Sequence, residues 1–221
     1  MTEPESARSE PLSRDQVLRR IHSGGGPEKL NLSGGNLRGI DLAGEYLHAI
    51  TLRRADLSDA DLRHTNLREA VMEDATLERA NLAGASLQWA NLRSTNLRQA
   101  NFEGADLKHA DCVVAYLHQA NLQRADLEEA DLVGAILQEA NLRGANLRRA
   151  NLRGANLRRA VLDGADLSGA DLWRANLMDA SLVGCKLADA NLQDANLVGA
   201  NLTGADLAAA SGAGSEAGAG G

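Results

Sequence analysis

Residues 140–159 read ANLRGANLRRANLRGANLRR, four copies of a five-residue pattern in which Ala, then Asn or Asp, then Leu precede two variable residues. The same register runs from Leu30 to Leu207, and its central position, every fifth residue from Leu32, occurs 36 times. Leu fills 33 of these centres, Ala stands two residues earlier in 28 units, and Asn or Asp lies between them in 26. The three other centres are Met72, Phe102 and Cys112. Nearly the whole chain is therefore one repeat array.

A period of five residues fits neither a straight helix nor a straight strand. On an α-helix, five residues advance about 140° beyond one full turn, so the Leu side chains would wind around all sides. On a continuous strand, successive Leu side chains would point to opposite faces. A chain that turns once per unit keeps Ala and Leu inside, because these two residues are two apart and share a face. The pattern therefore predicts a solenoid of very short extended segments joined by corners.

The glycines indicate how many sides this solenoid has. Thirteen units carry Gly two residues after the centre. When the units are sorted into four columns, one column of nine units holds seven of these glycines, whereas the other 27 units hold six. This bias predicts a four-sided coil of 20 residues. The corner glycine is the third residue of a turn that starts at the central Leu, where a type II turn requires a positive φ.

On these repeats and corner glycines, the chain resembles the pentapeptide-repeat proteins, a family of right-handed quadrilateral β-helices. The resemblance covers residues 30–207 and implies an all-β fold with about nine four-sided coils. At ~4.8 Å between neighbouring strands, the rod is expected to be roughly 43 Å long. The resemblance implies a fold more than a function, because members of this family have diverse roles.

Two short segments flank the predicted rod. Residues 1–29 hold five acids, five bases and no apolar run, so they are neither a signal peptide nor a membrane anchor. Within them, Ser13 and Gln16 form a capping-box pattern that predicts a short helix over residues 14–22. We expect this helix to cap the open N-terminal end of the rod. Residues 208–221 are rich in Gly and Ala, which predicts a flexible tail.

The C-terminal end of the rod has no comparable cover in the sequence. No Leu, Val, Ile or aromatic residue follows Leu207. An uncovered coil exposes strand edges and the Leu–Ala cross-section, and the terminal repeats of solenoids need capping. Two arrangements are open. Either two copies form a homodimer through Leu202 and Leu207, C-terminus to C-terminus, or the tail links the rod to a further domain.

No residue pattern indicates catalysis, a cofactor or a metal. Cys112 and Cys185 occupy inward positions more than three coils apart, so we expect two small buried hydrophobic residues in the reducing cytoplasm. The histidines do not converge, whereas a metal needs three or four ligands around one point. Straight walls without insertion loops offer no deep pocket. We therefore predict a cytoplasmic protein that is not an enzyme, with no cofactor, no metal and no membrane contact.

Charge is unevenly distributed along the predicted rod. The formal net charge is −7, yet residues 141–160 carry six arginines and no acid. Residues 20 apart stack in this fold, which places acids against many of these arginines. The expected pairs are Glu128–Arg148, Glu129–Arg149, Glu139–Arg159, Asp59–Arg79, Arg54–Asp74 and Arg174–Asp194. Such exposed pairs contribute about 0–1 kcal/mol each. Because they cancel much of the arginine charge and no aromatic platform is present, direct nucleic-acid binding is not expected.

One surface feature departs from the repeat. Tyr116 and Ile136 replace Asn or Asp at outward positions one coil apart, Val113 and Val133 stack on the adjoining side, and Val114 lies at the corner between them. A contiguous apolar patch marks a contact surface more often than scattered apolar residues do. We interpret these five residues, hereafter the apolar patch, as an interaction surface, with neutral drift as the alternative.

The two tryptophans stand apart from this patch. Trp89 and Trp173 fall on different sides of the coil, and we expect each to be isolated.

Two functions remain. The first is a non-catalytic structural or protein-interaction module, a rigid rod that presents flat walls to a protein partner. The resemblance implies the alternative, because some bacterial pentapeptide-repeat proteins mimic B-form DNA, bind the type II topoisomerase gyrase and protect it from quinolones. The net charge of −7 suits this alternative. The arginines of residues 141–160 and the lack of projecting loops and of an apparent C-terminal dimerisation helix argue against it.

Overall fold

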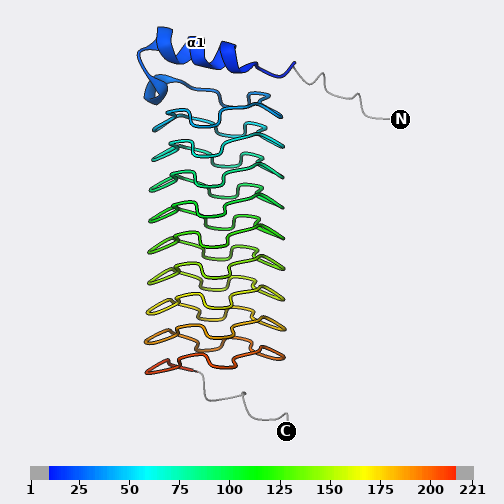
Figure 1. Cartoon of the computed structure of the whole chain (residues 1–221), viewed down its shortest axis with the longest axis vertical. Helices are drawn as coiled ribbons and strands as arrows, with labels where there is room; N and C mark the ends of the chain where they lie inside the picture. The colour runs from blue at the N-terminus through cyan, green and yellow to red at the C-terminus, as the bar shows by residue number, and fades with distance from the viewer. Residues whose placement is uncertain (1–9, 213–221) are drawn as a thin grey trace, which may run out of the picture.

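Parallel bridges join each unit of the rod to the unit 20 residues later. The computed structural model describes residues 10–212, and within them the bridges run from the Asn31–Thr51 pair to the Asn191–Ser211 pair. Four units of five residues therefore close one coil, and successive coils stack into the straight rod of Figure 1. The predicted 20-residue, four-sided coil is confirmed.

Every corner of the rod has the same backbone conformation. The residue two after each centre has a positive φ at all 36 corners, from 51° at Val114 to 72° at Gly44 and Gly199. The next residue closes the turn by donating its N–H to the carbonyl of the centre, as Ile40 does to Leu37 at 3.1 Å. Only 13 of these corner residues are glycine, and the other 23 adopt a conformation that costs a non-glycine residue roughly 1–2 kcal/mol. The contacts between coils must therefore hold most corners in place.

Three main-chain hydrogen bonds per unit connect one coil to the next, and they are not balanced in direction. The N–H groups of Leu32 and Gly34 donate to the following coil, at 2.8 Å to Thr51 O and 2.8 Å to Arg53 O. One bond runs the other way, from Thr51 N–H to Leu30 O at 3.1 Å. Because this pattern repeats along the rod, two donors face the C-terminal end for each donor that faces the N-terminal end.

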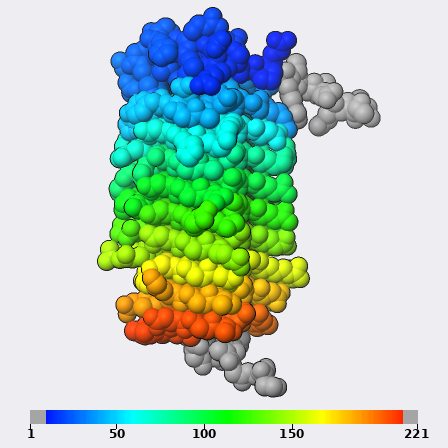
Figure 2. All heavy atoms as spheres, viewed as in Figure 1, coloured from blue at the N-terminus to red at the C-terminus, as the bar shows by residue number. Residues whose placement is uncertain are grey.

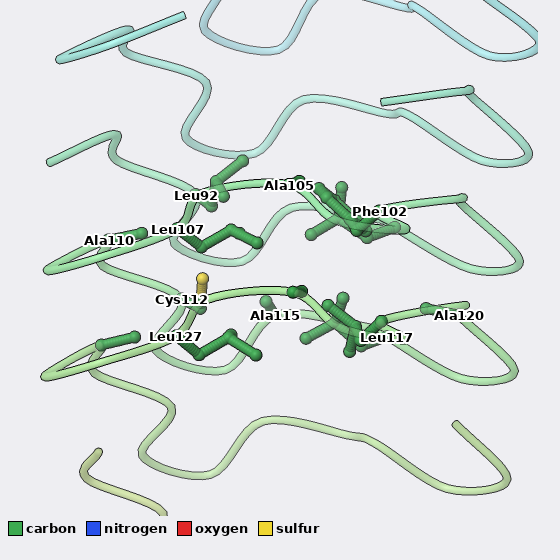
Figure 3. Packing of buried hydrophobic residues seen from close by; sticks show 14 of the residues in the cluster. Leu92, Phe102, Ala105, Leu107, Ala110, Cys112, Ala115, Leu117, Ala120 and Leu127 are labelled. Atoms are coloured by element: carbon green, nitrogen blue, oxygen red, sulfur yellow. The ribbon is translucent and has the colours of Figure 1, made fainter. Parts of the chain in front are cut away.

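Leu and Ala from all four sides fill the interior of the rod (Figure 3). Phe102, which is fully buried, is the one aromatic residue in the core of the described chain. Polar residues at Ala positions form hydrogen bonds to main-chain carbonyl groups, because a buried hydroxyl without a partner is costly. Thr65 donates to Leu42 O at 3.0 Å, and Thr95 donates to Met72 O at 2.9 Å. The core is thus a narrow column of small apolar contacts.

The outward Asn and Asp residues stabilise the corners and the stack. Their Oδ1 atoms accept the N–H of the residue two positions later, as Asn141 does from Arg143 at 3.2 Å. Some also join coils through side chains, as in the 2.9 Å bond from Asn121 Nδ2 to Asn101 Oδ1. Both roles follow from the short polar side chain, which favours turns.

At the N-terminal end, helix α1 (Arg14–Gly24) lies across the first coil and is followed by the short 3-10 helix η1 (Pro27–Lys29) (Figure 1). The Ser13–Gln16 capping box is present. Val17 and Ile21 are buried in the same cluster as the Leu residues of the rod.

Polar contacts to Asn36, Asp41 and Glu45 attach the segment around α1 to the first coil, with Arg14 and Asp41 3.7 Å apart. Leu12 N–H donates to Asn36 O at 2.8 Å, and Arg14 forms an ion pair with Glu45. Glu45 stands where the repeat has Ala, and Arg14 partners its carboxylate. The pKa of Arg14 is raised, chiefly by its hydrogen bond to Glu45.

The repeat geometry continues past Leu207 at the other end. Ala209 has a φ of 54°, and Ser211 bridges Asn191. The inward residues of this last coil, including Leu202 and Leu207, are only partly buried. Residues 1–9 of the N-terminal segment and residues 213–221 of the expected tail lie outside the described residues. No helix within residues 10–212 has the length and apolarity needed to cross a membrane.

Candidate protein-interaction surface

The structure brings all five residues of the apolar patch together. Tyr116 bridges Ile136 on the neighbouring coil, and Val114 N–H donates to Val133 O at 2.9 Å. Val114 is 44% exposed and Tyr116 is 40% exposed, whereas Val113, Val133 and Ile136 are half-buried. The patch therefore straddles one corner of two adjacent coils and offers apolar surface to solvent.

Tyr116 and Ile136 cannot make the polar contacts that Asn96 and Asn156, which stack with them on the same side of the rod, make. Asn96 Oδ1 accepts Arg98 N–H at 3.3 Å, and Asn156 Oδ1 accepts Arg158 N–H at 3.2 Å. Tyr116 and Ile136 have no Oδ1 and cannot cap their corners in this way. Corner capping therefore does not explain these two residues.

The corner next to the patch continues into a cation–aromatic cluster. Hydrogen bonds of 2.9 Å connect Gly134 N–H to Arg153 O and Gly154 N–H to Trp173 O, so residues 133, 153 and 173 follow one another along the stack. Arg153 Cζ lies 4.5 Å from the ring centroid of Trp173, and Arg174 Cζ lies 4.2 Å from it. Two guanidinium groups thus contact the Trp173 ring, and the prediction that it is isolated is wrong.

Trp89 is not isolated either. Its ring stacks on His109 with 4.0 Å between centroids, and His109 Nδ1 lies 3.4 Å from Glu129 Oε2. Both tryptophan contacts join residues 20 apart, Trp89 with His109 and Arg153 with Trp173. The stacking rule that predicts ion pairs would therefore have found them.

Most of the expected ladder pairs form. They are Glu129–Arg149 at 3.4 Å, Asp59–Arg79 at 2.7 Å, Arg54–Asp74 at 3.7 Å and Arg174–Asp194 at 3.7 Å. The other two predictions are wrong. Arg159 pairs with Asp179 at 3.8 Å instead of Glu139, and Arg148 has no ion pair within residues 10–212.

Glu139 is held by amides rather than by arginine. Gln119 Nε2 donates to it at 2.9 Å and Gln138 Nε2 at 3.4 Å. These two bonds, with Gln119 first, lower the pKa of Glu139.

A second spacing of ion pairs was missed at the sequence level. The residue after a centre also reaches the outward Asp 18 positions later, on the next coil of the same side. Examples are Arg93–Asp111 at 3.1 Å, Lys108–Asp126 at 3.0 Å and Arg153–Asp171 at 3.1 Å. The basic side chain in each of these pairs therefore lies along its own side of the rod, towards the residue before the centre, rather than towards the corner that follows it.

Both cysteines lie in the core of the rod. Burial raises the pKa of the Cys112 thiol to about 12 and that of Cys185 to about 11, and both cysteines are free. Figure 3 shows the sulfur of Cys112 inside the column of Leu and Ala. Among residues 10–212, no three His, Cys, Asp or Glu side chains are placed to hold a metal. The face visible in Figure 2 is a wall of stacked rows without a deep hollow.

A family model described as pentapeptide repeats matches the chain in eight copies, over residues 55–93, 85–113, 110–149, 135–174, 145–184 and 175–211. Among solved structures, the chain is similar to HetL, a pentapeptide repeat protein involved in heterocyst differentiation regulation from the cyanobacterium Nostoc sp. strain PCC 7120. The two chains are 37% identical, the match covers 89% of this chain and 95% of HetL, and the TM-score is 0.75.

Full-length QnrB1, a plasmid-mediated fluoroquinolone resistance protein, is 21% identical over 73% of this chain and 79% of its own. Its TM-score of 0.31 is too low to support an argument. A comparison with curated proteins gives no match. The repeat matches and the likeness to HetL agree with the observed four-sided coil and imply its right-handed form. This chain belongs to the pentapeptide-repeat family and folds as a right-handed quadrilateral β-helix.

Proposed function

We propose that this protein is a non-catalytic interaction module, a rigid rod that binds a protein partner through the apolar patch. The observation that carries this proposal is the grouping of Val113, Val114, Tyr116, Val133 and Ile136 on adjacent coils, where the repeat otherwise places polar side chains. An exposed contiguous apolar surface is typical of protein contacts. The likeness to HetL, whose described role is regulatory, is compatible with binding rather than catalysis.

In this proposal the two ends of the rod have different roles. Helix α1 caps the first of nine coils, because Val17 and Ile21 bury their side chains there. The C-terminal coil has partly buried Leu202 and Leu207 at its open end and joins a second copy. The patch, which lies between the ends, stays accessible on the wall of such a dimer.

The test replaces Tyr116 and Ile136 with Asn, the residue usual at these positions. Val71→Asn with Val161→Asn is the matched control, since both valines occupy the same repeat position on other sides. Partners recovered from the native host with the parent protein are quantified for each variant. We expect the first pair to lose a partner that the control pair retains. Equal recovery with both pairs would show that the patch is neutral drift.

The acidic character of the rod supports a second function, modulation of a type II topoisomerase by DNA mimicry. The net charge is −7, and the side opposite Tyr116 and Ile136 carries Asp106, Asp126, Glu128 and Asp166. A gyrase supercoiling assay with and without the purified protein and a quinolone tests it. Unchanged supercoiling and unchanged quinolone inhibition would exclude this function.

A further inference from the structure

The side of the rod that carries Tyr116 and Ile136 has no acidic residue between its corners over six coils. On this side, hereafter the acid-free side, the positions immediately before and after each centre run from Asn96 to Val198 and hold neither Asp nor Glu. They do hold two arginines, Arg98 and Arg158. On the opposite side, the corresponding positions from residue 86 to residue 188 hold four acids. On the side of Tyr116 and Ile136, the acids stand only at the corner, at Glu139 and Asp179, and none lies between the corners.

Arg98 and Arg158 make no ion pair within residues 10–212, unlike most arginines of the rod. The reason lies in the two spacings that create ion pairs elsewhere. Arg93 and Arg153 each pair with an Asp 18 positions later in the sequence. The residue 18 positions after Arg98 is Tyr116, and the residue 18 positions after Arg158 is Asn176. Tyr116 therefore adds apolar surface, and neither Tyr116 nor Asn176 can act as a counter-ion to the arginine 18 positions earlier.

The neighbours 20 residues away supply no free carboxylate either. Next to Arg98 in the stack are Glu78, which pairs with Arg79, and His118. Arg158 lies between Gln138 and Met178 in the stack, and its Nε is buried without a hydrogen-bond partner. Neither arginine therefore has an ion-pair partner within the described residues.

The two guanidinium groups flank the apolar pair along the axis of the rod. Arg98 and Arg158 are 60 residues apart, which is three coils or about 14 Å. Tyr116 and Ile136 lie on the two coils between them. Along the axis, the row Arg98, His118, Gln138 and Arg158 therefore runs beside the row Asn96, Tyr116, Ile136 and Asn156, and the two cations bracket the coils that carry the apolar pair.

We propose that the acid-free side binds an acidic protein segment with an apolar centre, in which carboxylates about 14 Å apart pair with Arg98 and Arg158 while apolar side chains cover Tyr116 and Ile136 in the neighbouring row. A spacing of about 14 Å corresponds to roughly four residues of extended chain or nine residues of helix. The proposal rests on the interaction function proposed above and adds the chemistry of the partner. A nucleic acid fits the site less well, because it has no apolar side chains to cover Tyr116 and Ile136.

The test selects binders from a displayed library of random peptides on the immobilised full chain. We expect the enriched peptides to carry Asp or Glu on both sides of apolar residues. Arg98→Gln with Arg158→Gln should weaken their binding by about tenfold or more, since two partly exposed ion pairs are lost. Raising the salt concentration should weaken binding to the parent more than binding to this variant.

Arg68→Gln with Arg148→Gln is the matched control. These arginines occupy the same position of the repeat on the opposite side and make no ion pair within the described chain. Their main-chain N–H groups donate to Asn66 Oδ1 and Asn146 Oδ1, as the main-chain N–H groups of Arg98 and Arg158 donate to Asn96 and Asn156. Binding to the control should equal binding to the parent. Circular dichroism of both variants checks that the fold is intact.

The outcomes separate this proposal from the proposed function. Peptides that lose binding to Tyr116→Asn with Ile136→Asn but bind Arg98→Gln with Arg158→Gln unchanged would overturn the acidic partner and leave the patch as a contact surface. If no enriched peptide depends on either pair, both proposals fail. A single-stranded DNA oligonucleotide that binds more tightly than the peptides, and depends on Arg98 and Arg158, would identify nucleic acid as the occupant and overturn the inference.

Discussion

The side chain of Val114 lies over Gly134, one coil further along the rod. A Cβ added to Gly134 would lie 3.3 Å from Val114 Cγ1, so the missing side chain of one corner residue makes room for the other. Val114 itself has a φ of 51°, a conformation in which a β-branched residue is a genuine outlier. This corner therefore keeps an exposed apolar side chain against its local conformational preference.

Val114→Gly should increase the free energy of unfolding by about 1 kcal/mol, because glycine has no Cβ to oppose a positive φ. Val113→Gly is the control. Val113 is not among the residues with positive φ, so the same chemical change there should lower the free energy of unfolding. Urea denaturation of the two variants measures both effects. A loss of stability in Val114→Gly as large as that in Val113→Gly would show that the corner is not strained.

Phe102→Ala should cost about 3–5 kcal/mol of unfolding free energy, because the fully buried ring leaves a cavity that a narrow stacked core cannot close. Phe102→Leu should cost less than about 1.5 kcal/mol, since Leu fills 33 of the 36 centres. Chemical denaturation monitored by circular dichroism checks the ranking. Similar losses in the two variants would mean that the site was adapted to an aromatic ring.

Stability should fall as the pH rises from about 9 towards about 12, in part because of Cys112. Burial raises the pKa of this thiol from 9.0 to about 12 in the folded protein. Between these values the unfolded chain loses the thiol proton and the folded chain keeps it, so unfolding becomes more favourable with pH. The contribution is complete below the unfolded pKa and is lost at higher pH.

Cys112→Leu isolates this effect from the other groups that titrate in the same range. The variant should lose less stability than the parent between pH 9 and pH 12, as measured by thermal melting at each pH. Parallel pH profiles for the two proteins would contradict the assignment.

Leu202→Lys should convert a dimeric protein to monomer or make it aggregate, because it places a charge in the partly buried end of the last coil. Thr203→Lys, an exposed position on the same coil, should leave the mass unchanged. Light scattering over a range of concentrations measures the mass. A parent protein that is monomeric at high concentration would rule out the C-terminal contact of Leu202 and Leu207.

The sequence predicts the main chain of this protein better than its surface. The inward positions and the 20-residue coil follow from Leu, Ala and Gly, and the Ser13–Gln16 capping box follows from spacing. Surface contacts depend also on the direction in which each corner sends its side chains. For this reason the 18-residue pairs were missed and Arg159 was assigned to Glu139 instead of Asp179, whereas the Arg153–Trp173 contact follows the 20-residue spacing and could have been predicted.

The apolar patch was found from sequence because its members break the repeat. The lack of counter-ions around Arg98 and Arg158 was not found, because it needs both spacings to be known. Glycine was likewise an incomplete guide to the corners, since 23 of the corners with positive φ are occupied by other residues.

The unequal direction of the hydrogen bonds between coils gives the rod a polarity, much as a helix has a dipole. Within residues 10–212, the N–H groups of Leu202 and Gly204 have no main-chain acceptor, whereas the N–H groups of the equivalent Leu182 and Gly184 donate to Asn201 and Thr203 at 2.8 and 2.9 Å. If two C-terminal ends met face to face, each would present more main-chain N–H donors than carbonyl acceptors, so many of these N–H groups would have no partner. Main-chain pairing can therefore extend the stack only in one orientation, head to tail, and α1 occupies the head. The proposed two-fold contact at the tail would have to be held by side chains, and it would close the assembly after two copies.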